Sequence, residues 1–458
     1  MRTLFGYRDY RHLFAAQVVA LFGSGLTTVA LGLLAYQLAG ADSAVVLGNA
    51  LTIKMIGYVT IAPVAAAYAD RVPRRLLLVG LDVVRAGVVL ALPFVDHLWQ
   101  IYLLVAVLQS ASAAFTPTFQ AVIPDVVTDE GAYTRALSAS QLASTMESLL
   151  SPVLAALALT VLSFHWLFVG TAAGFVASAA LVLTTRIPNA GPNPRESAWD
   201  RTFSGIRIFV RTPRLRGVLA LDLAVACCGA IVIVTTVTYV RDVLAGNQAD
   251  VAWLLAASGA GTMVVAVALP PILERVRERT VMLCGGAVLL TGAASAVQLS
   301  TAAVPYRWGA AIVVWALIGS GMSLVLTPIG RVLRRSSSPA DRPAVFAAQF
   351  SLSHLCWLLA YPIAGWGATL AGFTVTWTLL GVLSALGVVA AVFAWPRHDP
   401  EVLPHTHTVT DTDHRHIAGA TAVDHRHVEH THAFIIDQDH LRWPVGQLGS
   451  SPIGLLRR

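Results

Sequence analysis

Long apolar runs separated by short polar segments dominate the chain between residues 12 and 395. Most runs hold roughly 20 residues or more, the length that an α-helix needs to cross a hydrocarbon core about 30 Å thick. We therefore predict an all-α polytopic membrane protein with about twelve transmembrane helices. The runs lie near residues 12–38, 44–68, 76–95, 98–121, 136–160, 164–185, 216–240, 250–273, 281–300, 306–330, 343–370 and 373–395.

The composition supports the membrane class and excludes a soluble globular domain. Hydrophobic residues make up 56% of the 458 residues and charged residues only 12%, whereas soluble domains carry about 25% charged residues. The first run is too long for the apolar core of a signal peptide and ends without a clear cleavage site. All four cysteines fall inside the apolar runs, so we expect packing residues and neither disulfides nor a metal-binding C-x-x-C pair.

The positions of the basic residues predict the orientation in the membrane. With the N-terminus in the cytoplasm, the inside segments hold 21 of the 31 basic residues, whereas the outside loops hold only Arg241 and Arg307. This asymmetry follows the positive-inside rule, so we expect a protein of the cell inner (cytoplasmic) membrane with both termini in the cytoplasm. The net charge of +6 reports this topology and does not indicate a nucleic-acid-binding face.

The chain repeats itself in the two halves. A-D-R-V-P-R-R at 69–75 recurs as L-E-R-V-R-E-R at 273–279, and T-P at 116–117 recurs at 327–328, with offsets of 204 and 211 residues. Repeats of this kind are typical of secondary transporters, whose two halves rock about a central site.

The repeat divides the chain into four segments. We expect a six-helix bundle at 1–185, a cytoplasmic linker with an amphipathic helix at 186–215, and a second six-helix bundle at 216–395. A His-rich, largely disordered cytoplasmic tail is expected at 396–458.

The stretch A-A-Y-A-D-R-V-P-R-R, residues 66–75, resembles the loop after the second helix of the major facilitator superfamily, G-x-L-A-D-R-x-G-R-R. The resemblance implies that Asp70, Arg71, Arg74 and Arg75 form a gating loop that steadies the outward-open state. Departures from the pattern occur at Ala66, Tyr68 and Pro73.

Three further segments resemble one branch of that family. L-D-V-V-R-A-G at 81–87, T-P-T-F-Q-A-V-I-P-D-V-V at 116–127 and G-I-R-I-F-V-R-T-P-R-L-R-G-V-L-A-L-D-L at 205–223 are similar to the twelve-helix drug:proton antiporters. That branch includes macrolide-efflux and enterobactin-export proteins. The resemblance covers roughly residues 8–395 and implies a monomeric secondary transporter that exchanges a small amphipathic molecule for protons.

A charged group at the bilayer centre costs about 2.5–3.5 kcal/mol, so each one needs a reason. Lys54 is the only lysine, and it lies about as deep in its apolar run as Glu147 and His354 lie in theirs. In the family's architecture these residues fall on helices that border the interface of the halves. We expect Lys54 to neutralise a proton-exchanging carboxylate, with Glu147 as first choice of partner and Asp222 as second. Lysine suits this role because it can lose its proton on burial, whereas arginine stays charged.

Structural alternatives stay open for each of these residues. Lys54 and Glu147 can form a fixed pair that only locks two helices together. His354 can be a satisfied histidine of a helix interface. Asp222 can pair with an arginine near the surface, such as Arg214.

Asp82 and Arg85 have the i, i+3 spacing of a helical ion pair, so we expect a structural brace. An ATP-binding P-loop requires lysine before serine or threonine, and the only lysine precedes Met55. The sequence also lacks an H-E-x-x-H motif. We therefore expect no enzyme and no cofactor, and energy from an ion gradient, most plausibly of protons.

The tail is rich in H-x-H pairs among acidic residues, which are ligand types for zinc, nickel or copper. We expect weak metal binding by this tail, and the alternative is a disordered polar segment with incidental metal affinity. The candidate ligands are His405, His407, His414, His416, His425, His427, His430 and His432.

Three functions remain open from the sequence. The first is proton-coupled efflux of an amphipathic drug or secondary metabolite. The second is export of a metallophore or siderophore, or metal-linked transport that involves the tail. The third is a non-transporting membrane sensor on the same fold, which the buried charges and the gating loop disfavour.

Overall fold

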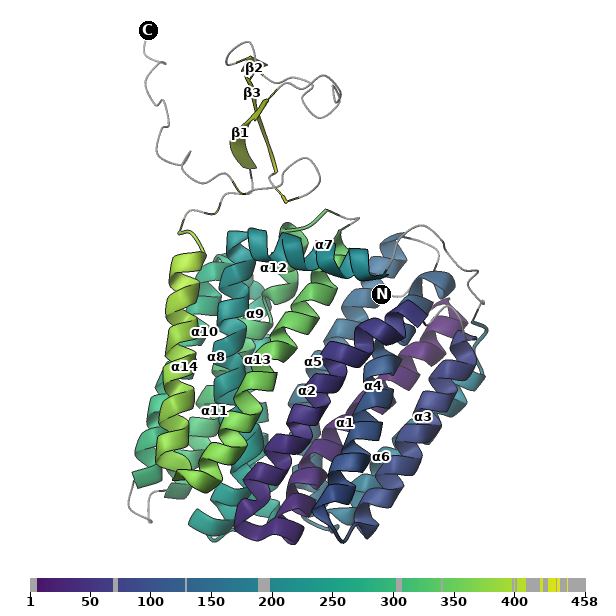
Figure 1. The fold of residues 1–458 in the computed structure, drawn as a ribbon, viewed down its shortest axis with the longest axis vertical. Helices are drawn as coiled ribbons and strands as arrows, with labels where there is room; N and C mark the ends of the chain where they lie inside the picture. Colours follow the sequence, from purple (N-terminus) through teal and green to yellow (C-terminus); the bar gives the residue numbers. More distant parts are fainter. Residues whose placement is uncertain are drawn as a thin grey trace.

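The body of the molecule is a bundle of long helices that lie side by side (Figure 1). Each helix satisfies its backbone hydrogen bonds internally, as a lipid environment requires. The computed structural model describes residues 6–68, 73–127, 130–187, 198–301, 307–338, 341–397, 399, 402–408, 421–422, 427–433, 435–436 and 443.

The helices coincide with the apolar runs of the sequence. The first half consists of α1 (Arg8–Ala39), η2 (Gly40–Asp42), α2 (Ser43–Tyr68), α3 (Arg74–Ala91), η4 (Leu92–Phe94), α4 (Leu98–Val126), α5 (Glu130–Leu159) and α6 (His165–Leu183). The linker contains α7 (Ala198–Arg211). The second half consists of α8 (Pro213–Thr238), η5 (Tyr239–Val243), α9 (Gln248–Leu273), α10 (Glu278–Thr301), α11 (Arg307–Leu326), α12 (Ile329–Arg335), α13 (Arg342–Leu370) and α14 (Gly372–Ala394).

The outer surface of the bundle suits lipid. Ten stretches of the described chain are long and apolar enough to cross a membrane, and the first of them, Arg8–Ile61, contains α1 and most of α2. Large apolar side chains face outward: Phe94, Val161 and Phe393 are 81%, 81% and 84% exposed. Hydrocarbon tails cover such side chains without cost, whereas water does not. The chain is therefore a multi-pass membrane protein.

The helices pair in the same order in both halves. In the first half α1 packs against α5 and α6, α2 against α4, and α3 against α4 and α6. In the second half α8 packs against α13 and α14, α9 against α11, and α10 against α11 and α14. The halves meet where α2 packs along α13 and α5 along α9. Helix α1 begins and α14 ends at the same end of the bundle (Figure 1).

Two arginines that the internal repeat aligns occupy equivalent places. Arg75 at the start of α3 donates to the carbonyl of Leu183, the last residue of α6. Arg279 at the start of α10 donates to the carbonyls of Trp395 (3.0 Å) and Val392 (3.3 Å) at the end of α14. The last carbonyls of a helix have no partner within the helix, so each arginine satisfies the end of a neighbouring helix.

Helix α7 crosses the end of the bundle where α1 begins (Figure 1). Its Phe209 is fully buried and Ile208 is 6% exposed. Gly205 permits close approach, because a methyl group there would overlap the Ala344 carbonyl on α13. The helix packs on α13, α2 and α8, so the linker contacts both halves and is more than a tether.

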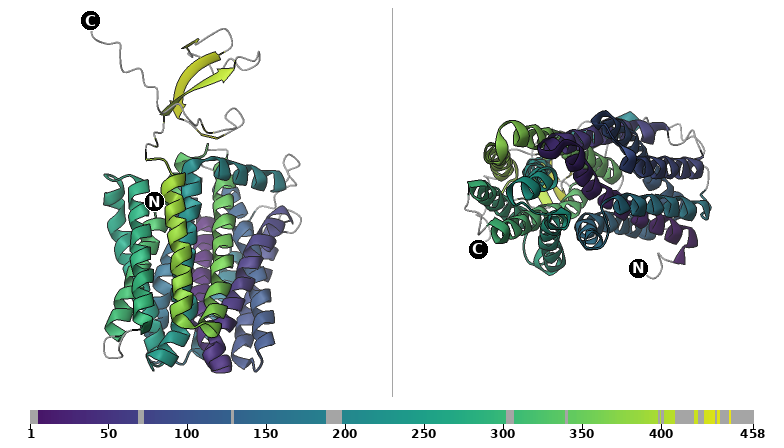
Figure 2. Two further views of the ribbon diagram at one scale, coloured as in Figure 1. Left: turned by 60° about the vertical axis from the view of Figure 1, so that its left-hand side comes forward. Right: turned by 90° about the horizontal axis from the view of Figure 1, so that it is seen from below.

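The tail carries a three-stranded antiparallel sheet in the order β1-β3-β2 (Figure 2). The strands are β1 (Val402–Thr408), β2 (Thr421–Ala422) and β3 (His427–Ala433). The prediction of a largely disordered tail is wrong for these residues. Valine and threonine recur along β1 and β3, and such β-branched residues favour strands once a partner strand completes the hydrogen bonds.

Candidate functional site

A cluster of polar and aromatic residues lies where the two halves meet, and we call it the interface cluster: Lys54 and Tyr58 of α2, Glu147 of α5, and Phe350 and His354 of α13. The ammonium nitrogen of Lys54 lies 5.9 Å from the centroid of the Tyr58 ring. The Tyr58 ring packs against those of Phe350 at 5.5 Å and His354 at 5.1 Å between centroids. All five side chains are half-buried. The cluster thus joins α2 and α13 by aromatic contacts and places a cation beside them.

Lys54 and Glu147 interact electrostatically, but no direct ion pair joins them in the described part of the chain. The alternative of a fixed pair that locks two helices together remains a prediction to be tested.

The Glu147 carboxylate faces α1 at Gly25. A methyl group at Gly25 would lie 2.5 Å from Oε1 of Glu147 and would overlap the hydroxyl of Ser151. Real carbon atoms never approach so closely, so the absent side chain of Gly25 lets α1 and α5 approach at this level. Neither Gly25 nor Ser151 was predicted from the sequence, because nothing local marks a close approach of distant helices.

His354 is held by its own helix. Its Nδ1 lies 2.6 Å from the carbonyl oxygen of Phe350, one turn earlier, and the two rings lie 4.1 Å apart. A carbonyl only accepts, so Nδ1 carries the proton and Nε2 of the neutral ring is the free acceptor. The structure supplies His354 with the contacts of a satisfied interface histidine.

Asp222 of α8 is buried with an amide partner. Its exposed fraction is 2%, and Oδ2 accepts a hydrogen bond of 2.8 Å from Nε2 of Gln349 on α13. Its Oδ1 has no hydrogen-bond partner among the described residues. The alternative that Asp222 pairs with an arginine near the surface is wrong for this structure, because its side-chain partner is Gln349 and no ion pair joins it to an arginine among the described residues. Gln349 was missed, although an amide in an apolar run is itself a signal.

Asp82 and Arg85 form an ion pair inside the first half, and both side chains are almost fully buried. The Arg85 guanidinium lies between two rings, 4.1 Å from the centroid of Phe115 on α4 and 4.5 Å from that of Phe175 on α6. Cation–π contacts of this kind fasten α3 to both neighbours. The pair acts as a brace within the half.

Parts of the predicted gating loop and tail lie outside the described residues. These are Asp70, Arg71, His414, His416 and His425. Arg74 is described and is 8% exposed at the start of α3. The other candidate histidines lie on β1 and β3, where the structure describes the backbone. Among the side chains that it describes, no group of three or more histidine, cysteine, aspartate or glutamate residues could hold a metal ion.

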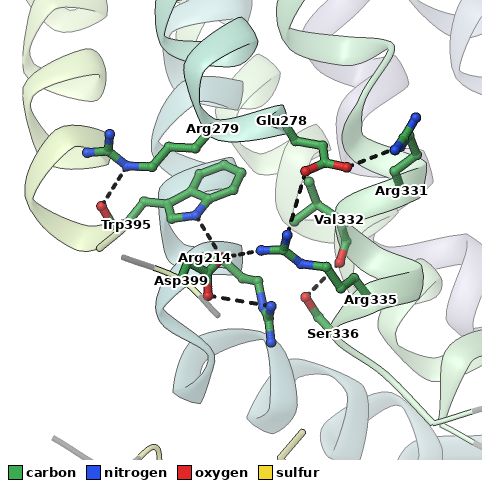
Figure 3. A network of polar contacts seen from close by, with 9 residues as sticks. All are labelled: Arg214, Glu278, Arg279, Arg331, Val332, Arg335, Ser336, Trp395 and Asp399. Carbon is green, nitrogen blue, oxygen red and sulfur yellow. Dashed lines mark hydrogen bonds and ion pairs between the residues drawn. The ribbon is translucent and has the colours of Figure 1, made fainter. Parts of the chain in front are cut away.

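A second group of charges lies at the end of the bundle where α7 crosses it, and we call it the charge network: Arg214, Glu278, Arg331, Arg335 and Asp399 (Figure 3). Asp399 pairs with Arg335 and, at 3.5 Å, with Arg214 of α8. Glu278 of α10 pairs with Arg331 at 3.1 Å and Arg335 at 3.6 Å.

Asp399 also accepts a hydrogen bond of 3.1 Å from the indole nitrogen of Trp395. The network thereby joins α8, α10 and α12 to the first residues of the tail. Sequence reasoning missed this network, because Asp399 follows the last apolar run and has the pattern of an ordinary surface residue.

At the opposite end of the bundle, side-chain contacts join the two halves, and we call them the distal seam. Tyr36 donates to Asp242 at 2.5 Å, and the hydroxyl oxygens of Ser43 and Thr238 lie 2.8 Å apart. The indole of Trp366 donates to Asn49 at 3.1 Å.

The backbones come equally close at the distal seam. A methyl group at Gly48 of α2 would lie 2.9 Å from the carbonyl of Tyr361 and 3.0 Å from Cα of Gly365 on α13. The two halves are therefore in close contact at this end.

Comparison with known proteins identifies the relatives of this chain. The sequence model of the Major Facilitator Superfamily matches residues 13–302 and 223–419. The MFS-type transporter YfiS of Bacillus subtilis (strain 168) is 24% identical over 404 residues, which cover 83% of this chain and 92% of that protein. Macrolide efflux protein A of Streptococcus pyogenes is 26% identical over 184 residues, 39% of this chain and 45% of that protein.

Among solved structures, the nucleoside transporter NupG is similar in fold. It superposes with a TM-score of 0.65 at 13% identity and covers 84% of this chain and 98% of its own. At this identity the likeness concerns the fold alone.

Proposed function

Because the chain belongs to the Major Facilitator Superfamily, we propose that it is a secondary active transporter that works by alternating access of two six-helix halves with twelve spanning helices. The equivalent helix pairing in the two halves supports this architecture. In such proteins the halves rock about a site between them. The interface cluster is that site.

The substrate is a small amphipathic molecule that is exported in exchange for protons. The observation that carries this proposal is the uncontacted pair of Lys54 and Glu147 beside the aromatic rings of Tyr58 and Phe350. Rings bind the apolar part of such a molecule, and the charged groups bind its polar part or exchange a proton. The relation to a macrolide efflux protein supports export.

We further propose that the protein is a monomer of the cytoplasmic membrane, with both termini and α7 in the cytoplasm. The arginine asymmetry of the loops supports this orientation. The distal seam then closes the outer end, and the structure represents a state with that end shut. Reporter fusions after residue 395 that read as external would contradict the orientation.

An accumulation assay in an efflux-deficient host tests the function. Cells that express the protein should accumulate less of at least one amphipathic compound from a panel, and a protonophore should abolish the difference. The matched control is Glu147→Gln, which keeps the shape of the side chain and removes its charge. Equal accumulation with and without the protein over the whole panel would exclude efflux of these compounds.

A cross-link across the distal seam tests alternating access. Ser43→Cys with Thr238→Cys places two sulfurs where hydroxyls now lie 2.8 Å apart, close to the length of about 2.05 Å of a disulfide. Oxidation should stop transport and reduction should restore it, whereas each single variant should respond to neither. Unchanged transport by the oxidised double variant would show that the seam does not open.

A further inference from the structure

The strand register of the tail brings four of its histidines together on one face. In the antiparallel pair of β1 and β3, His405 lies directly opposite His430. Two residues away on either side, Leu403 lies opposite His432 and His407 lies opposite Val428. Directly paired residues share a face, and so do residues two apart along a strand. His405, His407, His430 and His432 therefore lie on the same face of the sheet.

The opposite face holds a different set of residues. Thr406 is paired with Glu429 and Thr408 with His427, so His427 and the carboxylate of Glu429 are excluded from the histidine face. On the histidine face, β2 adds Ala422, which is paired with Val428. The four histidines thus share their face with apolar neighbours and with no acidic residue of the paired strands.

We propose that this face binds one borderline divalent metal ion, with Zn²⁺ as its representative, through the directly opposed His405 and His430 together with one neighbour on the same face, His407 or His432. Neutral imidazole is a preferred ligand of Zn²⁺, Ni²⁺ and Cu²⁺, and three histidines with a water in the fourth position form a tetrahedral Zn²⁺ shell. His407 and His432 are four residues apart along the strands, about 13 Å, so only one of them can join His405 and His430 on the same ion. Mg²⁺ and Ca²⁺ require oxygen ligands and are excluded by this set. The proposal does not depend on whether the protein transports anything.

The sheet changes the expected affinity of the tail. H-x-H pairs in a flexible chain must be ordered by the metal, whereas a paired hairpin already holds them at neighbouring positions. One described residue before the strands and one after them contact the bundle. Asp399 before β1 pairs with Arg214, and the ring of Trp443 after β3 lies 5.0 Å from the guanidinium of Arg214. Residues on both sides of the strands are therefore held at Arg214, at the start of α8.

Zn²⁺ titration of the purified, metal-free full-length protein tests the proposal, with a chromophoric chelator as competitor. We expect one tight Zn²⁺ per chain, with Mg²⁺ unable to displace it. His405→Ala with His430→Ala should weaken binding about 100-fold, the upper end of what loss of a supporting partner costs a metal site. The matched control, His414→Ala with His416→Ala, removes the same number of histidines from outside the strands and should leave the affinity unchanged. His427→Ala, on the opposite face of β3, should also bind normally.

A ligand exchange separates loss of coordination from loss of the hairpin. His405→Cys with His430→Cys changes the same two positions but supplies thiolates, which also bind Zn²⁺. Tight binding should return in this variant. The proposal is overturned if the cysteine variant binds no better than the alanine variant, or if removal of His414 and His416 weakens binding as much as removal of His405 and His430.

Discussion

The interface cluster and the charge network differ in how their charged side chains are paired. In the charge network each described carboxylate contacts two arginines, and Arg214, with a side chain that is 1% exposed, lies against Asp399. In the interface cluster Lys54 and Glu147 interact without contact and keep part of their surface exposed. Contacting ion pairs hold helices in one arrangement, whereas separated charges stay available for exchange. We therefore expect the charge network to stabilise the fold and the interface cluster to take part in transport.

The comparison predicts the largest effect on transport at Lys54. Lys54→Arg keeps the positive charge but removes the ability to lose a proton, because arginine stays charged in proteins. We expect normal insertion and a loss of proton-coupled transport of about tenfold or more, the scale that proton-transfer groups contribute to rates. Transport assays in proteoliposomes with an imposed pH gradient measure this. Wild-type transport by Lys54→Arg would leave Lys54 as a fixed structural charge.

In the charge network the largest effect should fall on stability. Asp399→Asn removes the charge that Asp399 contributes beside the buried Arg214 and beside Arg335, and breaking a buried pair costs about 3–5 kcal/mol. The thermal midpoint in detergent should fall by several degrees, while transport per folded molecule should stay normal. Glu278→Gln is the control: its partners Arg331 and Arg335 are 50% and 22% exposed and Arg335 keeps Asp399, so the loss should be about 1 kcal/mol or less. Equal losses of stability in both variants would contradict a special role for the buried pair of Asp399 and Arg214.

A third prediction concerns the space around Glu147. Gly25→Ala places a methyl group 2.5 Å from the Glu147 carboxylate, so the side chain must turn away or α1 must shift. We expect transport to fall several-fold with the protein still folded, because overpacking costs about 1–3 kcal/mol. Gly87→Ala on α3 is the matched control, since nothing lies within 4 Å of the added methyl group there. If both variants transport alike, the orientation of Glu147 does not matter.

The apolar pattern predicted the helices well, because each run of hydrophobic residues must leave water as one continuous helix. It also singled out Lys54 and Glu147, because a charged side chain in a membrane-spanning run is energetically costly and therefore rare. The contact partners of these charged residues could not be predicted from the sequence. Gln349 stands 127 positions from Asp222 and the pair exists only in the folded chain. The tail was predicted from composition, which contains no information about register and so could not reveal the histidine face.

We expect the smallest effect on transport at His354. Its substitution tests whether this residue takes part in proton exchange or only packs in the interface cluster. The ring touches Tyr58 and Phe350, yet its proton is committed to the Phe350 carbonyl of its own helix. A group whose donor is already satisfied contributes packing and no exchangeable proton. His354→Gln, which keeps a donor of similar reach, should change transport by no more than about twofold, the scale of a lost ring contact of about 0.5 kcal/mol. The pH profile of transport should stay unchanged, and a shifted profile would place His354 in the proton path beside Lys54.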